Sequence, residues 1–276
     1  MSIAVDPLVN RFKHRLAAGD VQVGMWTSFA HPVAAEIVAG AGFDWLLIDA
    51  EHAPNPPATV LTQLQAAQGS PTAVIVRPPN AAAGELQPLA DVGVTTFLLP
   101  MIETPEQAAD AVAALRYPPR GRRGVATTRA SRWGRVPDYW QRADAEMCVI
   151  AQIETVAGLA ALEAIAGVDG VDAVFLGPSD LSAALGRLGE PNHPDVQTVV
   201  SDAIRQARAA GAAVGVFATA TETAGRYADA GATMIAAGVD TTLLAMATAQ
   251  LADNYAPLRR RRPDTPASES QPSEVH

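Results

Sequence analysis

Three ionisable residues stand within four positions at the end of an apolar run. The run is WLLIDAEHAPN, residues 45–55, and the ionisable residues are Asp49, Glu51 and His52. Asp49 precedes His52 by three residues, and we expect its carboxylate to fix the imidazole tautomer and raise its basicity. His52 is therefore a candidate general base; the plainer interpretation is a loop histidine with satisfied hydrogen bonds.

Polar residues also end three other apolar runs. Arg77 ends TAVIVRP (72–78), Gln152 and Glu154 end MCVIAQIE (147–154), and Asp180 follows AVFLGP (173–178). A guanidinium at such a position holds a carboxylate or a developing enolate oxygen, unless it serves only in a surface salt bridge.

Glu154 and Asp180 are the candidate metal ligands, because carboxylate oxygens suit Mg²⁺ or Mn²⁺ and leave positions for water and substrate. The alternative for each is helix capping, since Ser179 or Asp180 would be a good N-cap for the following LSAALG. The metal site is favoured because Arg77 and the Asp-Glu-His cluster are expected at the same rim of the barrel.

Eight apolar runs, each followed by an Ala-rich segment of helical period, are positioned to carry these residues. This alternation predicts parallel strands buried on both faces, and eight units in about 250 residues predict a (β/α)8 barrel with its chemistry at the carboxyl ends of the strands. An open doubly wound sheet is the alternative, but no GxGxxG follows the first run. The runs are 21–26, 45–50, 72–78, 95–101, 147–154, 173–178, 213–218 and 234–240.

Two segments interrupt the alternation. A helix over 105–116 leads into a Pro-, Gly- and Arg-rich stretch of about 24 residues, which we expect to be an ordered excursion. The tail, residues 259–276, has no apolar pattern and is predicted to be disordered. The predicted organisation is thus a single barrel domain over residues 1–258, with an amphipathic N-terminal helix, followed by the tail.

Composition restricts the partners. The net charge of −9 argues against nucleic-acid binding, and the absence of a long apolar run or an N-terminal apolar region indicates neither a membrane span nor a secretory signal. We therefore expect a cytoplasmic protein that acts on small molecules. The single cysteine, Cys148, is expected to be a buried hydrophobe.

The basic residues comprise nineteen arginines and one lysine, Lys13, which precedes the first predicted strand. A Schiff-base aldolase or a pyridoxal phosphate enzyme needs a lysine inside the barrel, so both are excluded if the barrel forms. A cation chelated by a 2-oxo acid, with an arginine and a base, instead favours proton removal next to the keto group. This set predicts a pyruvate enolate and hence aldol addition or cleavage.

The strings GFDWLLIDAEHAPN, VIVRP, RYPPRGRRGV, RASRWGRVPDYW, CVIAQIET, GVDAVFLGPSDLSAALG and GATMIAAGVDTTLLA resemble the metal-dependent class II pyruvate aldolases of the 4-hydroxy-2-oxoheptanedioate aldolase and 2-keto-3-deoxy-rhamnonate aldolase family. The resemblance runs in order from about residue 20 to 255. It implies reversible cleavage of a 4-hydroxy-2-oxo acid to pyruvate or hydroxypyruvate and an aldehyde, with Mg²⁺, Mn²⁺ or Co²⁺.

The resemblance also implies roles for single residues. Glu154 and Asp180 correspond to the metal ligands, His52 assisted by Asp49 to the acid/base group, and Arg77 to the residue that holds the keto or enolate oxygen. Other residues are expected around the substrate: Gln152 beside the metal, Glu51 as a supporting carboxylate, Trp26 as an aromatic wall over pyruvate, and Phe217 at the aldehyde end. The backbone N–H groups of the segment Gly177, Pro178, Ser179 and Asp180 are expected to bind the carboxylate.

The family is typically a homo-hexamer, a dimer of trimers. That assembly implies that RASRWGRVPDYW and TTLLAMATAQLADNY form interfaces. The excess of arginine from 116 to 135 then serves subunit contacts, unless it steers an acidic substrate.

The sequence departs from the resemblance at the aldehyde end, because Phe217 stands where relatives commonly carry leucine. A bulkier ring at the aldehyde end favours a short acceptor. Two other functions stay open at this point: a CoA-ester lyase of the malyl-CoA or citramalyl-CoA type, which uses the same metal and carboxylate chemistry, and a barrel that binds ligand without catalysis.

Overall fold

Eight parallel strands close into one barrel in the order β1 to β8, with β8 paired to β1. The structure is a computed structural model that describes residue 6 and residues 8–259. All eight predicted strands are confirmed, as is the (β/α)8 class. The strands are β1 (Gln22–Thr27), β2 (Trp45–Asp49), β3 (Ala73–Arg77), β4 (Thr96–Leu99), β5 (Cys148–Ile153), β6 (Ala173–Leu176), β7 (Ala213–Phe217) and β8 (Met234–Val239).

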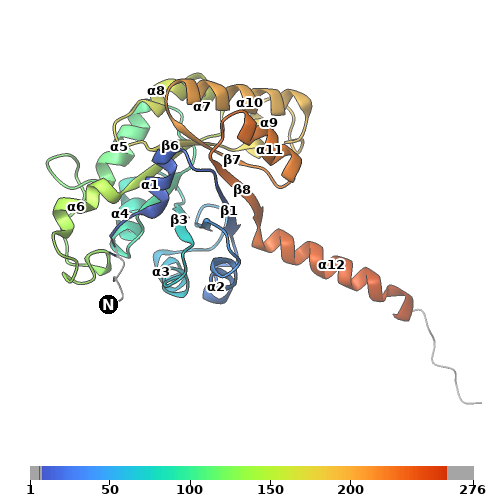
Figure 1. The fold of residues 1–276 in the computed structure, drawn as a ribbon, viewed down its shortest axis with the longest axis horizontal. Coiled ribbons are helices and arrows are strands. Elements are labelled where there is room, and N and C mark those ends of the chain that lie inside the picture. Colours follow the sequence, from blue (N-terminus) through green and yellow to red (C-terminus); the bar gives the residue numbers. More distant parts are fainter. Residues whose placement is uncertain (1–5, 7, 260–276) are drawn as a thin grey trace, which may run out of the picture. The chain divides into compact units, whose positions relative to one another are not determined.

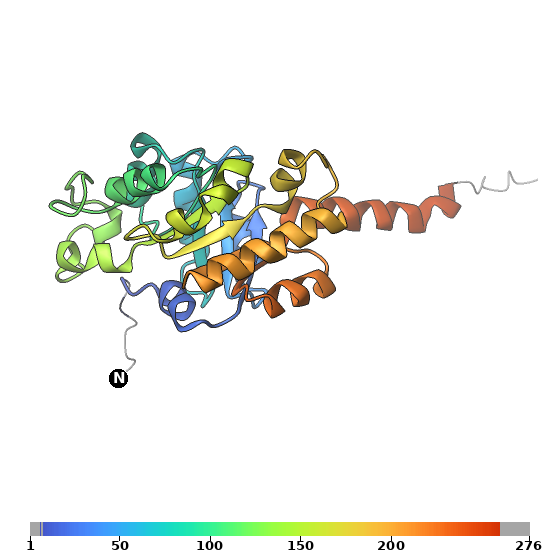
Figure 2. The same ribbon diagram turned by 90° about the horizontal axis from the view of Figure 1, so that it is seen from above.

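Helices surround the barrel and follow the strands in sequence (Figure 1). In the turned view of Figure 2, the orange helices α10 and α11 run along the outer face of the late strands, consistent with contacts of α10 with β6 and β7 and of α11 with β8. The helices are α1 (Arg11–Ala18), α2 (Pro32–Ala39), α3 (Pro57–Ala66), α4 (Ala83–Asp91), α5 (Pro105–Leu115), α6 (Tyr139–Glu146), α7 (Val156–Ala160), α8 (Leu162–Ala166), α9 (Pro178–Ala184), α10 (Pro194–Ala209), α11 (Thr221–Asp229) and α12 (Asp240–Arg259).

The compact unit of the chain ends at Thr241, and a second unit begins at Thr242. The first unit contains the whole barrel, and the domain boundary after residue 258 stays a prediction. Of the 20 residues of α12, Asp240 is the only one that is buried. Apart from Arg259, the predicted disordered tail lies outside the described residues.

Local sequence explains where several helices end and strands begin. Gly93 and Gly231, each placed between a helix and the next strand, have φ of 101° and 114°. Only glycine adopts such angles without steric cost. The predicted excursion after α5 contains a short 3₁₀ helix, η1 (Arg129–Ser131), followed by α6.

Two apolar layers hold the barrel. One lies between the strands and the surrounding helices, and the other fills the barrel interior, where Trp45, Leu47 and Phe175 pack with Phe12 and Leu16 of α1. Because α1 belongs to the interior layer, it closes the amino-terminal end of the barrel. The open end is therefore the carboxyl end of the strands, the end that carries catalytic residues in barrels of this class.

Lys13 belongs to the closed end. Its Nζ lies 2.6 Å from the carbonyl oxygen of Met147 and 3.1 Å from Asp172. Met147 precedes β5, and Glu154 follows it, so at about 3.3 Å per residue the two ends are roughly 20 Å apart. The only lysine therefore does not reach the candidate site, as the sequence predicts.

Candidate active site

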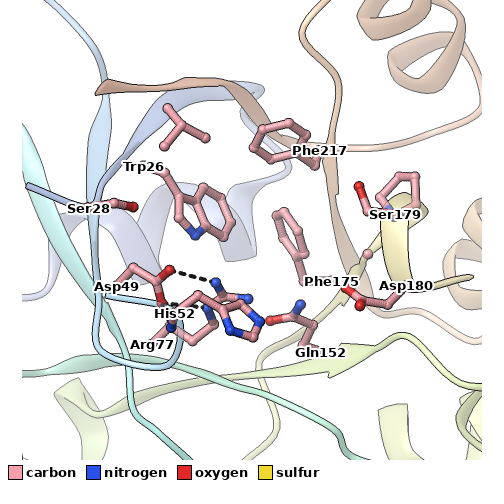
Figure 3. Close-up of a pocket in the computed structure, with 13 residues that line it drawn as sticks. Trp26, Ser28, Asp49, His52, Arg77, Gln152, Phe175, Ser179, Asp180 and Phe217 are labelled. Carbon is pink, nitrogen blue, oxygen red and sulfur yellow. Dashed lines mark hydrogen bonds and ion pairs between the residues drawn. The ribbon is translucent and has the colours of Figure 1, made fainter. Parts of the chain in front are cut away.

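A cavity of about 240 Å³ opens at the carboxyl ends of the strands. It brings together ten of the twelve residues predicted for the site; Glu51 and Glu154 contact these lining residues from behind. Figure 3 shows the lining side chains. The lining residues are Trp26, Ser28, Asp49, His52, Arg77, Gln152, Phe175, Gly177, Pro178, Ser179, Asp180, Phe217 and Val239.

Asp49 and Arg77 form a buried, two-pronged ion pair across β2 and β3. Arg77 Nε donates to Asp49 Oδ1 at 2.9 Å and Nη2 donates to Oδ2 at 2.8 Å (Figure 3). The register pairs Asp49 with Arg77, so adjacent strands set this contact directly. Such bidentate pairs fix the plane of the guanidinium. Burial alone would lower the pKa of Arg77, but the hydrogen bond and the negative charge of Asp49 outweigh burial and raise this pKa.

The position of Asp49 differs from the prediction that it orients the imidazole of His52. Its carboxylate faces Arg77 and also accepts the backbone N–H of Glu51 at 3.1 Å and of His52 at 3.4 Å. Asp49 thus shapes the loop that carries His52 but does not contact the ring. The strand register explains the difference, because it places the Arg77 guanidinium beside Asp49 before the loop turns.

Glu51 is the carboxylate beside the imidazole ring of His52. Its Oε2 lies 3.7 Å from His52 Nε2 and 2.9 Å from Arg77 Nη1. Burial raises the pKa of Glu51, more than the positive charge of Arg77 lowers it. The side chain of His52 is 69% exposed at the mouth of the cavity, a position from which an imidazole can exchange protons with solvent.

Glu154 is a buried carboxylate with both oxygens occupied. Oε1 accepts the backbone N–H of Met101 at 2.8 Å, and Oε2 accepts from Gln152 Nε2. Met101 has a φ of 56°, and this left-handed backbone at the end of β4 accompanies the contact of its N–H with Glu154. Left-handed backbone in a residue other than glycine is strained and is often found at functional sites.

Burial raises the pKa of Glu154 to about 7, and the negative charges of Asp180 and Glu51 add to the rise. A carboxyl with a raised pKa favours the folded state most at low pH, and this contribution is lost as the pH rises through about 7. A cation bound beside Glu154 and Asp180 would offset the electrostatic cost of ionising the buried Glu154 carboxyl. Asp180 itself is exposed at the start of α9.

The residues present fit a hard divalent cation. Among the described residues, no group of three or more His, Cys, Asp and Glu side chains is arranged to hold a metal. However, Mg²⁺ is commonly held by one or two carboxylates together with water and substrate oxygens. Gln152 Oε1 is buried and lacks a hydrogen-bond partner within the described part of the chain. It would accept from a water on such a cation.

The backbone at the start of α9 offers fewer donors than predicted. Pro178 has no N–H, and the N–H of Gly177 donates to the carbonyl oxygen of Ile153 at 3.3 Å. This leaves the N–H groups of Ser179 and Asp180 for a substrate carboxylate. Neither helix cap proposed as an alternative is formed, because Gly177 is the N-cap and has no side chain.

Several residues of the site were not predicted. Ser28, Phe175 and Val239 line the cavity, and Asp240 accepts the backbone N–H of Ser28 at 2.8 Å. Phe175 lies two positions before Gly177, so the alternation of side chains along β6 is a signal that could have placed it inside the barrel. Ser28 follows β1, and Val239 is the last residue of β8, where it is out of step with the interior side chains of Met234 and Ala236. Neither residue carries such a signal.

Asn55 was likewise not predicted to support the site. Its Nδ2 donates to the carbonyl oxygen of Asp49 at 2.5 Å, and Gln63 of α3 donates to Asn55 Oδ1 at 2.7 Å. Both side chains are buried. They tie the loop after β2 to the next helix and hold the backbone beneath His52.

A closed parallel barrel with ionisable side chains at the carboxyl ends of its strands is the architecture of a (β/α)8-barrel enzyme. Residues 22–247 match the model of the HpcH/HpaI aldolase/citrate lyase family, and the chain belongs to this family. The match confirms the resemblance on which the sequence interpretation rests.

Individual relatives agree with this assignment. The chain is 51% identical to a hydroxypyruvate/pyruvate aldolase of Deinococcus radiodurans over 91% of both chains. It is also 51% identical to a 4-hydroxy-2-oxo-heptane-1,7-dioate aldolase of Salmonella arizonae, over 89% of this chain and 94% of the relative.

A solved structure of an HpcH/HpaI aldolase/citrate lyase family protein from Burkholderia cenocepacia is also similar. It has 40% identity and a TM-score of 0.85, over 89% of this chain and 99% of the other.

Proposed function

We propose that the chain catalyses the reversible, metal-dependent cleavage of a 4-hydroxy-2-oxo acid to pyruvate, or hydroxypyruvate, and an aldehyde. The observation that carries the proposal is the convergence of Glu154, Asp180, Arg77 and His52 on one cavity, with Lys13 at the opposite end of the barrel. The names of the relatives, which are aldolases acting on this class of substrate, support the same chemistry.

Glu154 and Asp180 are the residues that would hold the cation, which we propose to be Mg²⁺, Mn²⁺ or Co²⁺. When bound, such a cation polarises the keto group and offsets the enolate charge. Arg77, fixed in plane by Asp49, places its remaining N–H groups toward the same keto oxygen. The N–H groups of Ser179 and Asp180 orient the substrate carboxylate.

His52 moves the protons. In cleavage it takes the proton of the C4 hydroxyl, the C3–C4 bond breaks, and its electron pair passes to the enolate of the 2-oxo acid. Protonation of the enolate at C3 then gives pyruvate and frees the base. Because the ring is largely exposed, it exchanges its proton with solvent between turnovers.

The direct test is pyruvate release from a 4-hydroxy-2-oxo acid by His52→Ala. We expect a loss of roughly 10²- to 10⁴-fold, the usual contribution of a general acid/base group, with cation binding retained. His14→Ala is the matched control, since His14 is also exposed and pairs with Glu146 at the other end of the barrel. Full activity of His52→Ala would place the base elsewhere.

The acceptor is proposed to be a short aldehyde. Phe217 lies on the cavity wall and packs edge-on against Trp26, with ring centroids 5.6 Å apart. The ring occupies space that a smaller side chain would leave to the aldehyde. A long acceptor is therefore disfavoured.

A homo-hexamer, arranged as a dimer of trimers, is the proposed assembly. Six large apolar side chains of α12 are exposed, as are Trp133 and Trp140 in the excursion after α5. Exposed apolar patches of this kind mark protein interfaces. The six are Leu243, Leu244, Met246, Leu251, Tyr255 and Leu258.

The assembly is measured by analytical ultracentrifugation. Leu244→Glu with Leu251→Glu should dissociate the hexamer, and a monomer already in the wild type would contradict it. Four of the seven arginines between 116 and 135 form ion pairs inside the chain. Arg129 donates to the carbonyl oxygen of Val92, which leaves Arg132 and Arg135 for subunit contacts or substrate steering.

The proposed compartment is the cytoplasm. No helix of the described residues is long and apolar enough to cross a membrane. The support for the proposal is Cys148, a free thiol that is fully buried in β5 and makes no disulfide, as is usual in reducing compartments.

A further inference from the structure

Trp26 is held rigidly at the wall of the cavity. The residue is 5% exposed, and its ring packs against Trp45, Phe175 and Phe217 with centroid separations of 5.9, 5.5 and 5.6 Å. Three aromatic neighbours leave the indole no freedom to turn. The direction of its N–H is therefore fixed by packing.

The N–H of this indole has no acceptor in the protein. The neighbouring Trp45 Nε1 donates to the carbonyl oxygen of Gln22 at 3.3 Å, whereas Trp26 Nε1 makes no hydrogen bond within the residues described. Figure 3 shows its nitrogen on the side of the ring that faces Arg77 and His52, inside the cavity. This nitrogen is not among the fully buried unpaired polar atoms of the described residues, so it is accessible from the cavity, where a bound ligand can accept from its N–H.

A second set of unpaired donors lies opposite. Arg77 uses Nε and one Nη2 hydrogen for Asp49, and Nη1 lies beside Glu51. At least two of its five N–H groups remain. Arg77 Cζ is 5.7 Å from the centroid of the Trp26 ring. Arg77 and Trp26 both line the cavity, so the remaining Arg77 N–H groups and the indole N–H are available to a ligand bound there.

We propose that Trp26 is a catalytic residue, which donates a hydrogen bond through Nε1–H to the keto oxygen of the bound 2-oxo acid. This inference rests on the proposed function. When the C3–H bond breaks, the proton passes to the base and the electron pair moves to the C2 oxygen. Trp26 and Arg77 would both donate hydrogen bonds to the C2 oxygen, where the negative charge develops. A donor that is already fixed in place needs no rearrangement to stabilise this charge.

The experiment replaces only the N–H. Trp26→β-(3-benzothienyl)alanine keeps the size and shape of the ring but has sulfur in place of the donor. With the Mg²⁺-loaded enzyme and pyruvate alone, exchange of the C3 protons with deuterium is followed by NMR. We expect the exchange rate to fall roughly 10- to 100-fold, which is less than the roughly 10²- to 10³-fold usual for removal of one oxyanion donor, because Arg77 remains. The Kd for pyruvate should change less than threefold.

Trp26→Phe provides a second variant. It also removes the donor and should show the same loss of exchange, with a lower Tm from the lost packing. The matched control is Trp45→β-(3-benzothienyl)alanine, which removes an indole N–H from the same aromatic cluster but not from the cavity. It should lower the Tm and leave the exchange rate within threefold of the wild type.

The outcomes separate this proposal from the function on which it rests. If the wild type exchanges the C3 protons and the Trp26 analogue does so at the same rate, the indole N–H has no catalytic role. Equal losses at Trp26 and Trp45 would also overturn the proposal, because the effect would then come from packing. If the wild type itself does not exchange these protons, the proposed enolate chemistry fails first.

Discussion

Gly177→Ala is expected to weaken cation binding through contact with Glu154. A methyl group on Gly177 would lie 3.0 Å from Glu154 Oε2, 3.2 Å from Glu154 Cβ and 3.4 Å from Gln152 Nε2. Gly177 has a φ of −97°, so the backbone itself tolerates alanine. The effect comes from crowding alone.

Glu154 cannot move aside without cost. Its Oε1 is held by the N–H of Met101 and its Oε2 by Gln152, so a shift of a few tenths of an ångström weakens at least one bond to a charged group. Such a bond contributes about 1.5–3 kcal/mol. We therefore expect the Kd for Mn²⁺, measured by isothermal titration with pyruvate present, to rise roughly 10- to 150-fold.

The matched control is Gly225→Ala in the middle of α11, where an added methyl group meets no atom within 4 Å. It should raise the stability by up to about 1 kcal/mol, since alanine favours helix, and leave the Kd unchanged. Wild-type affinity in Gly177→Ala would refute the idea that Glu154 is held in place for a cation.

Three further predictions concern the same cavity. Arg77→Lys should slow pyruvate formation roughly 10²- to 10³-fold in steady-state assays, with cation Kd nearly unchanged, because one ammonium cannot pair with Asp49 and also hold the keto oxygen. Below pH 7, cation affinity should fall up to about tenfold per pH unit as Glu154 takes up its proton; a flat titration profile from pH 5 to 8 would contradict this. Phe217→Leu should raise kcat/KM for long aldehydes in a panel assay and leave kcat/KM for short aldehydes nearly unchanged, since the smaller side chain enlarges the cavity beside Trp26.

The barrel was predictable because its strands are continuous apolar runs and its helix ends carry glycine. WLLID and AVIVR read as buried strands from their residues alone, and both form as β2 and β3. The site residues followed from one rule, that the carboxyl ends of the strands share one face. The rule places Arg77, Gln152 and Asp180 around one cavity.

The pairing of the side chains was not predictable in the same way. Asp49 was expected to hold His52 because the two are close in sequence, but it binds Arg77, which is distant in sequence and adjacent by strand register. The contact of Glu154 with the N–H of Met101 depends on a left-handed backbone that no residue type signals. Spacing along the chain predicts which residues meet at the cavity, but not which of them bind one another.

Pyruvate release from a 4-hydroxy-2-oxo acid, before and after removal of divalent cations, tests the proposed chemistry most directly. We expect thorough chelation with EDTA to abolish release and Mg²⁺ or Mn²⁺ to restore it. Borohydride treatment with pyruvate should leave the activity intact, because Lys13 lies at the closed end of the barrel and forms no imine with substrate. Release that continues unchanged after chelation would contradict a metal-dependent aldolase.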